Sequence, residues 1–320
     1  MQTFDDFDAW AETIRTADLR LACDRVEKPV WRLATRRVGQ VFLQAATEGG
    51  GNLCYGGNTH PGTLLFVPLT RATQQVANCE RLDSGSVLVI PRGADFTIRV
   101  RGRAHAWCSI AIPDGPLEPA PWRRPGDRPG SFVARPGTKH VDRLRGLVRR
   151  LIGGPLGCRQ AEHAAARAVV SAAFDCLSTP CGPADVMGRP RVDRLTVIRR
   201  TLAHIERDPL SRPAVGALAA ELGVNERTLL RVFHDAWDVN PRDYLRLEQM
   251  HRIRRALRSA DPYESTVTDV LTRHGIWEFG RFAARYRRQF GESPSDTLRG
   301  RSAAISPPAA SSPPPSHGRD

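Results

Sequence analysis

The sequence predicts a multidomain α+β protein with a β-rich N-terminal half and an all-α C-terminal half. Residues 38–113 contain apolar or alternating runs interrupted by Gly, Asn and Pro, which is typical of short antiparallel strands. From residue 192 to residue 299, apolar residues instead recur at helical spacing. Within this helical half, a pair of helices joined by a glycine-containing turn occurs twice, which predicts a duplicated structural unit.

Length and charge limit the class of protein further. The chain has 320 residues, enough for roughly two domains, and its 41% apolar residues argue against general disorder. No window approaches the roughly 18–20 uncharged apolar residues of a transmembrane helix, and the acidic start MQTFDDFDAW argues against a secretory signal. We therefore expect no membrane association. The net charge of +13 favours a polyanionic partner.

The cysteine pattern is unlike that of a metal-binding or disulfide-stabilised protein. There are seven cysteines, an odd number, and none forms a CxxC pair. This argues against a structural zinc site and against a disulfide framework. We expect reduced thiols in a cytoplasmic protein, with a redox-sensing cysteine as the alternative.

The N-terminal segment, residues 1–137, is predicted to be a β-rich sensor domain. Residues 3–16 are expected to be helical, because Thr3 and Asp6 resemble a weak capping box. Strands are then expected in four runs, followed by a Pro-, Gly- and Arg-rich loop at 114–137. The four runs are residues 38–46, 62–70, 84–100 and 105–113. They indicate a small barrel or sandwich, and the segment 85–92 resembles the strand–turn segment of cupin-like sensor domains. The expected fold is therefore a cupin-like barrel with flanking helices.

The middle segment, residues 138–190, is predicted to be a helical connector that ends in a linker at 178–190. Two stretches have helical character, residues 141–151 and 164–177. They could pack on the β-rich domain or form a dimer contact, and the sequence leaves both open. The last twenty residues, 301–320, are rich in Pro, Ser and Ala and are expected to be disordered.

The helical segment, residues 191–300, begins with an amphipathic helix that ends at Asp208-Pro209. A short apolar helix follows and stops at Gly223, where a left-handed backbone suits glycine. Asn225 is a good N-cap for the next helix, residues 226–237. Helix, glycine-containing turn and helix form the helix-turn-helix pattern, whose second helix can enter a major groove. The residues expected on its outer face are Glu226, Arg227, Leu230, Arg231 and His234.

The pattern then recurs after a longer helix that starts near Pro241. Thr266 and Asp269 form a capping box, and Gly275 stops the helix that they begin. A second recognition helix is expected at residues 278–290. Its predicted inner face comprises Phe279, Phe282, Tyr286 and Phe290, and its predicted outer face comprises Gly280, Arg281, Ala284, Arg285 and Arg288. Ser293 to Asp296 are expected to cap a short last helix.

With two helix-turn-helix patterns, residues 191–300 resemble the DNA-binding domain of the AraC/XylS family of bacterial transcription regulators. In the first unit the resemblance rests on Leu218-Ala219, on Leu222-Gly223-Val224 and on Leu229-x-Arg231-x-Phe233. In the second unit it rests on GIWEFGRFAARYRRQFGESPSDTLR, residues 275–299, the most specific segment. This stretch resembles the branch whose second recognition helix contains Gly-Arg-Phe, including regulators of the ethanolamine-operon type.

The resemblance implies a sequence-specific regulator that binds double-stranded promoter DNA and activates transcription through RNA polymerase. It also implies a homodimer and an N-terminal domain that responds to a small molecule of unknown identity. The DNA-binding residues it implies are Arg227, Leu230, Arg231, His234, Gly280, Arg281 and Arg285. Ala284 departs from the family, because many members have Arg at this position. Arg281 and Arg285 therefore contact either bases or only phosphates.

Signals for an enzyme are weak, so we expect no catalytic residue, metal or cofactor. His60 and His105 lie in the β-rich half, but no HxH with a following Glu accompanies them. No GxSxG, Walker loop or HExxH motif is present. Two alternatives stay open: a ligand-independent architectural or dimeric DNA binder, and a cupin-like enzyme with a helical appendage.

Overall fold

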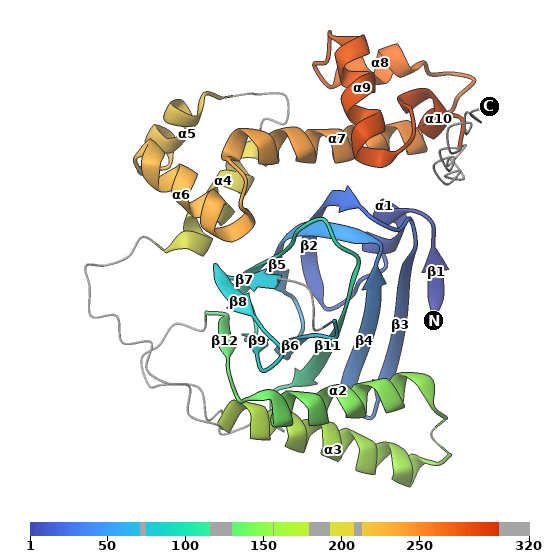
Figure 1. Ribbon diagram of the computed structural model, residues 1–320, viewed down its shortest axis with the longest axis vertical. Helices are drawn as coiled ribbons and strands as arrows, with labels where there is room; N and C mark the ends of the chain where they lie inside the picture. Colours follow the sequence, from blue (N-terminus) through green and yellow to red (C-terminus); the bar gives the residue numbers. More distant parts are fainter. Residues whose placement is uncertain (71–74, 116–129, 156, 179–192, 208–212, 301–320) are drawn as a thin grey trace, which may run out of the picture. The chain divides into compact units, whose positions relative to one another are not determined.

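A computed structural model describes residues 1–70, 75–115, 130–155, 157–178, 193–207 and 213–300 (Figure 1). The chain forms two compact units, residues 1–252 and 253–320, so the division falls within α7 (Pro241–Ser259). The boundaries expected at 137, 190 and 300 stay predictions. The expected tail 301–320 and nearly all of the linker 178–190 lie outside the described residues.

Strands of the first unit form two antiparallel sheets, which confirms the β-rich N-terminal half. One sheet has seven strands in the order β1-β3-β4-β11-β6-β9-β12. These are β1 (Gln2–Phe4), β3 (Trp31–Val38), β4 (Val41–Glu48), β11 (His105–Pro113), β6 (Gly62–Pro68), β9 (Val87–Ile90) and β12 (Phe132–Ala134). The other has the order β2-β5-β10-β7-β8. These are β2 (Ala17–Val26), β5 (Gly50–Asn58), β10 (Asp95–Val100), β7 (Gln75–Ala77) and β8 (Glu80–Leu82).

The two sheets face each other across an apolar core, so the described strands form a sandwich of two sheets rather than one closed barrel. This core takes alternate residues of the strands, such as Leu64 and Phe66 of β6. The residues that alternate with them, Leu65 and Val67, point outward into a second apolar cluster. Because both faces of the seven-stranded sheet are buried, its central strands have continuous apolar sequences.

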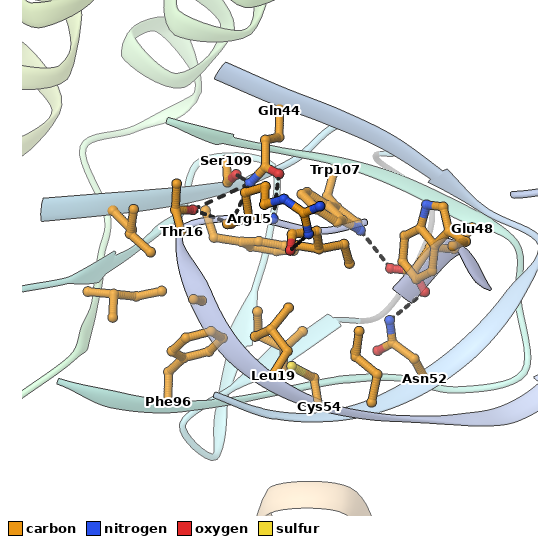
Figure 2. A pocket seen from close by; sticks show the side chains of 18 of the residues that line it. Arg15, Thr16, Leu19, Gln44, Glu48, Asn52, Cys54, Phe96, Trp107 and Ser109 are labelled. Atoms are coloured by element: carbon orange, nitrogen blue, oxygen red, sulfur yellow. Dashed lines mark hydrogen bonds between the residues drawn. The ribbon is translucent and has the colours of Figure 1, made fainter. Parts of the chain in front are cut away.

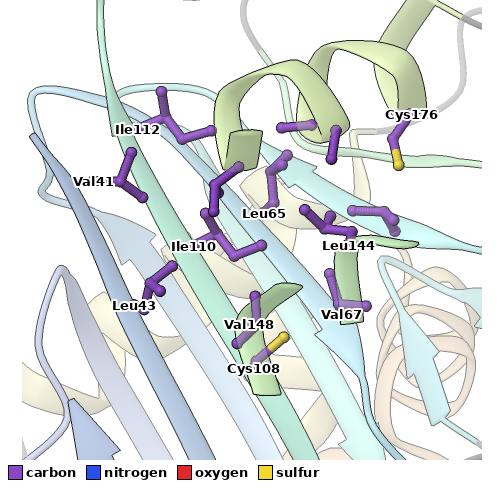
Figure 3. Close-up of a cluster of buried hydrophobic side chains, with 14 of the residues drawn as sticks. Val41, Leu43, Leu65, Val67, Cys108, Ile110, Ile112, Leu144, Val148 and Cys176 are labelled. Atoms are coloured by element: carbon purple, nitrogen blue, oxygen red, sulfur yellow. The ribbon is translucent and has the colours of Figure 1, made fainter. Parts of the chain in front are cut away.

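Helices α2 (Thr138–Gly153) and α3 (Arg159–Ser178) cover the outer face of the seven-stranded sheet (Figure 1). They confirm the two helices expected in the middle segment. Leu144 and Val148 of α2 pack with Leu43, Ile110 and other strand residues in one buried cluster (Figure 3). Packing on the β-rich domain, one of the two open interpretations, is therefore observed. Dimerisation through these helices stays a prediction.

Several N-terminal elements differ from expectation. The helix expected at 3–16 is wrong: residues 2–4 form an edge strand, and α1 (Phe7–Ala11) is capped by Asp6, which accepts a 2.8 Å hydrogen bond from Ala9 N. Strands β2, β3 (apart from Val38), β5, β7 and β8 lie outside the four predicted runs, and β12 lies in the segment predicted as a loop. In β5, glycine permits close packing, since a Cβ at Gly51 would lie 2.4 Å from the Val100 carbonyl oxygen. A glycine-rich strand lacks the usual β-propensity signal.

The C-terminal half is helical, as the sequence predicts. In the compact unit 1–252, three helices precede α7: α4 (Arg194–Arg207), α5 (Val215–Glu221) and α6 (Glu226–Trp237). In the compact unit 253–320, three described helices follow α7: α8 (Val267–Arg273), α9 (Phe279–Phe290) and α10 (Pro294–Leu298). No helix in the described part of the chain is both long enough and apolar enough to cross a bilayer.

Candidate DNA-binding surface and ligand cavity

The first helix-turn-helix unit consists of α5, a short turn and α6. Gly223 reverses the chain with a φ of +70°, in the left-handed region that suits glycine. The Val224 amide donates to the Ala219 carbonyl oxygen at 3.0 Å and closes the end of α5. Asn225 then begins α6, because its side chain accepts a 2.7 Å hydrogen bond from Thr228 N. Gly223 therefore ends α5 and Asn225 caps α6, as the sequence predicts.

A buried face fixes the orientation of α6. The face consists of Leu229, Val232, Phe233, Ala236 and Trp237. The Trp237 ring stacks on Tyr244 with 4.4 Å between ring centroids. Its indole nitrogen donates a 3.1 Å hydrogen bond to the carbonyl oxygen of Cys54 in β5. Since this face is packed and hydrogen-bonded, the opposite face is held outward.

The outward face of α6 carries the residues that the sequence predicts there, including Glu226, which is exposed at its start. Arg227, Leu230, Arg231 and His234 are all exposed, and their spacing places them on one side of the helix. Together with Arg101 of the β-rich domain they line one shallow hollow. Leu230 exposes 37% of its surface, although it is apolar. The hollow therefore combines these cationic or hydrogen-bonding side chains and one apolar contact with the acidic side chains Asp238 and Asp243, and Asp238 lies 3.2 Å from His234 Nε2.

The second helix-turn-helix unit, α8 and α9, has the same local construction. Thr266 and Asp269 form the predicted capping box at the start of α8. Gly275 has a φ of +69°, and the next residue, Ile276, is buried in the turn. The hydroxyl of Tyr286 in α9 lies 2.8 Å from Thr297 Oγ1. The capping box and the glycine turn therefore confirm the second helix-turn-helix that the sequence predicts.

The outward face of α9 differs in part from the prediction. Gly280, Arg281, Ala284 and Arg288 are exposed as expected, whereas Arg285 is half-buried. Phe279 was expected in the core but exposes 37% of its surface, because it is the first residue of α9 and lies before the buried stripe of Phe282 and Tyr286. Arg281 lies 3.2 Å from Glu278, so part of its charge is compensated.

Comparison with known proteins agrees with this geometry. Residues 218–300 match a family model described as a helix-turn-helix domain. A probable thc operon regulatory protein of Rhodococcus erythropolis is 32% identical over 103 residues, which are 32% of this chain and 31% of that protein. A XylDLEGF operon transcriptional activator of Pseudomonas putida is 31% identical over 100 residues, 31% of each chain. The C-terminal domain is of the AraC type.

The AraC-type domain accounts for the two helix-turn-helix units but not for the β-rich half. The chain spans only 31% of the length of either of these curated relatives. The solved structure of the AraC-like transcriptional activator CuxR aligns with 78% of this chain and 90% of its own, with 12% identity and a TM-score of 0.42.

A cavity lies between the two sheets of the β-rich half. The space that it encloses measures about 60 Å³. Its walls are mostly apolar, with Trp10, Phe66, Phe96 and Trp107 providing aromatic surface. Figure 2 shows two polar groups in it, one around Gln44 and Ser109 and one around Glu48 and Asn52.

The polar group around Glu48 is almost fully buried. Glu48 accepts a 2.6 Å hydrogen bond from Trp107 Nε1 and a 2.5 Å hydrogen bond from Asn52 Nδ2. His105 Nε2 lies 3.4 Å from the same carboxylate, and its Nδ1 lies 3.1 Å from the Gly50 carbonyl oxygen. Both ring nitrogens thus face acceptors, which favours the imidazolium form.

Apart from His105, these cavity residues were not predicted from the sequence. They come from β4, β5 and β11 and meet only through the strand register, and β5 itself was not predicted. His105 was considered only as a metal ligand. Among the described residues, no cluster of three His, Cys, Asp or Glu side chains could hold a metal ion. The available signal was the alternation of polar residues Gln44 and Glu48 along an otherwise apolar strand.

Replacing Asn225 with Ala should destabilise the start of α6. The loss of the N-cap hydrogen bond is expected to lower the free energy of unfolding by about 1 kcal/mol, whereas Asn225→Ser, which can still cap, should stay close to wild type. Equilibrium urea unfolding of the three proteins tests this. Equal stabilities of the Ala and Ser variants would contradict the capping role.

The stabilising effect of His105 should decrease with rising pH. Burial lowers the pKa of His105, but the charge of Glu48 and hydrogen bonds to Glu48 and to backbone carbonyls raise it more, so the net pKa is raised. A histidine whose pKa is raised by folding stabilises the folded state. This stabilisation is fully present below the pKa of the unfolded chain, about 6.5, and is lost as pH rises through the pKa of the folded protein.

We therefore expect the difference in unfolding free energy between wild type and His105→Gln to shrink from about pH 6 upward. Urea unfolding across this range measures the difference. A difference that stays constant or grows with pH would rule out the charged His105–Glu48 pair.

Proposed function

We propose that the chain is a sequence-specific transcription regulator that activates promoters in response to a small molecule bound by its N-terminal domain. The observation that carries the proposal is the outward face of α6, which presents Arg227, Leu230, Arg231 and His234 from an AraC-type domain. Activation is supported by the name of one relative, a XylDLEGF operon transcriptional activator. The proposal assigns no catalytic activity to the chain.

At the DNA, α6 would lie in the major groove with this face toward the bases. Arg227 and Arg231 can each form bidentate hydrogen bonds to guanine O6 and N7, and Leu230 can contact a thymine methyl group. His234, near the end of the helix, suits a phosphate contact. In the second unit, Gly280 leaves room for close approach, since a Cβ there would have no neighbour within 4 Å. Arg281 and Arg285 would supply phosphate or base contacts.

The cavity in the β-rich half is the site proposed for the effector. Strand β5 contributes side chains to this cavity and, from its other face, packs against the first helix-turn-helix unit. A bound molecule can shift the protein toward its DNA-competent state only through a difference in affinity between the two states. The shared strand gives the effector a direct way to produce that difference.

The remaining partners follow from the same proposal. Promoter binding implies a cytoplasmic protein that contacts RNA polymerase. We also propose a homodimer that forms through α3, because its Phe174 exposes 39% of its surface and lines a groove with Val170 and Ala166. Burying this apolar surface against a second copy would provide the driving force for association.

Replacing Arg227 and Arg231 together with Ala should abolish discrete promoter binding. Each bidentate contact to guanine contributes about 1–3 kcal/mol of discrimination, so the double variant should lose at least about tenfold in preference for its sites over competitor DNA. Genome-wide footprinting of wild type and variant measures this.

The matched control is Arg149→Ala with Arg150→Ala, which removes the same charge from an exposed part of α2. It should keep the discrete sites, because bulk charge contributes affinity without sequence preference. Diffuse binding by wild type and both variants would instead favour an architectural DNA binder.

A further inference from the structure

The cavity presents one hydrogen-bond acceptor that no described residue satisfies. Asn52 of β5 exposes only 3% of its surface and lines the cavity. Its Nδ2 donates to Glu48, but its Oδ1 has no hydrogen-bond partner among the described residues. A buried acceptor without a partner costs about 1–3 kcal/mol, so a ligand that supplies a donor gains affinity at this atom.

The neighbouring carboxylate fixes which atom of the Asn52 amide is left without a partner. Glu48 Oε2 lies 2.5 Å from the amide nitrogen, and a carboxylate oxygen can only accept a hydrogen bond. Exchanging the amide oxygen and nitrogen would bring two acceptors into contact. Figure 2 shows the amide nitrogen directed at Glu48 and the oxygen beside it. The atom of Asn52 that lacks a partner is therefore Oδ1, a hydrogen-bond acceptor.

The charges beside Asn52 favour a neutral ligand group at that end of the cavity. The guanidinium of Arg15, which also lines the cavity, donates a 2.8 Å hydrogen bond to the Glu12 carbonyl oxygen. Glu48 already accepts hydrogen bonds from Trp107 and Asn52 and faces His105, so a buried ligand cation would find no unpaired anion. A ligand anion at Asn52 would face both the amide oxygen and this carboxylate. Burial of a charge without a partner is strongly unfavourable.

The opposite polar group does not compete for the ligand's donor. The Gln44 amide accepts a 2.9 Å hydrogen bond from Arg15 N and donates to the Arg15 carbonyl oxygen at 2.9 Å and to Ser109 Oγ at 3.0 Å. Both ends of this side chain are thus satisfied within the protein. Between the two polar groups the walls are aromatic and aliphatic, with Trp10 and Trp107 in edge contact at 6.4 Å between ring centroids.

We propose that this cavity binds a neutral, largely apolar molecule, aromatic or aliphatic, whose hydroxyl or N–H group donates a hydrogen bond to Asn52 Oδ1. This inference rests on the proposed ligand-sensing function and specifies the chemistry of its ligand. Asn52 is then the residue that distinguishes a hydroxylated molecule from its ether or hydrocarbon analogue. A site built to bond a hydroxyl discriminates against an analogue that leaves its polar group buried and unpaired.

Three probes of similar size test the proposal on the purified full chain: 4-propylphenol, 4-propylanisole and 4-propylbenzoate. Isothermal titration calorimetry is expected to show the phenol binding about tenfold more tightly than the anisole, which lacks the donor. The benzoate should bind more weakly than the phenol because it carries a charge. Equal affinities for phenol and anisole, preference for the benzoate, or no binding of any probe would each overturn the proposal.

Two variants assign the selectivity to Asn52. Asn52→Leu should remove the preference for phenol over anisole while leaving the affinity for anisole near wild type. Ser109→Ala, which changes another polar residue of the cavity, should keep the preference. If Asn52→Leu keeps the preference, Asn52 is not the recognition residue and the proposal is wrong.

Footprinting of the same preparations separates this inference from the proposed function. Discrete sites that depend on Arg227 and Arg231, together with equal binding of phenol and anisole, would contradict the ligand chemistry alone. Loss of discrete sites with retained phenol preference would contradict the regulator function and leave the binding site intact.

Discussion

Strand β5 lines the cavity with one face and packs against helices α4 to α6 with the other, and the structure of residues 1–252 depends on this arrangement. Because side chains alternate along a strand, Asn52 and Cys54 point into the cavity while Leu53 points to the opposite side. Leu53 is 1% exposed and belongs to the apolar cluster formed by α4, α5 and α6. The Cys54 carbonyl oxygen accepts the hydrogen bond of Trp237. One strand thus forms both the wall of the cavity and the support of the first helix-turn-helix unit.

Apolar burial, rather than surface charge, holds this contact. Arg101 pairs with Asp238 at 3.0 Å, and Arg20 pairs with Glu206, but these side chains are partly exposed and such pairs contribute little in water. Leu53 and Trp237 instead lose nearly all of their contact with water. A molecule that alters the position of β5 from the cavity side would therefore act on the core that orients α6. This connects the proposed effector site with the proposed DNA-reading face through a single layer of structure.

The sequence predicted the helical half well because its signals are local. The glycines at 223 and 275, the Asn225 cap and the Thr266 capping box each act within one turn of chain, and the structure places them as expected. The β-rich half was predicted less completely, since a strand such as β5 is defined by its partners across the sheet. For the same reason the alternating pattern could indicate a sandwich or barrel but not the grouping of Glu48, Asn52 and His105. Phe279 was misplaced because helical spacing does not reveal where a buried stripe ends.

Hydrogen exchange of the full chain tests the double role of β5 most directly. Leu53→Ala removes the contact from the α6 side, and Leu65→Ala removes the same side chain from the cluster beneath α2 and α3. If β5 supports the first helix-turn-helix unit, amides of α6 will exchange faster in Leu53→Ala and remain at wild-type rates in Leu65→Ala, while α9 is unchanged in both. Unchanged exchange of α6 in Leu53→Ala, or equal acceleration in the two variants, would contradict the account.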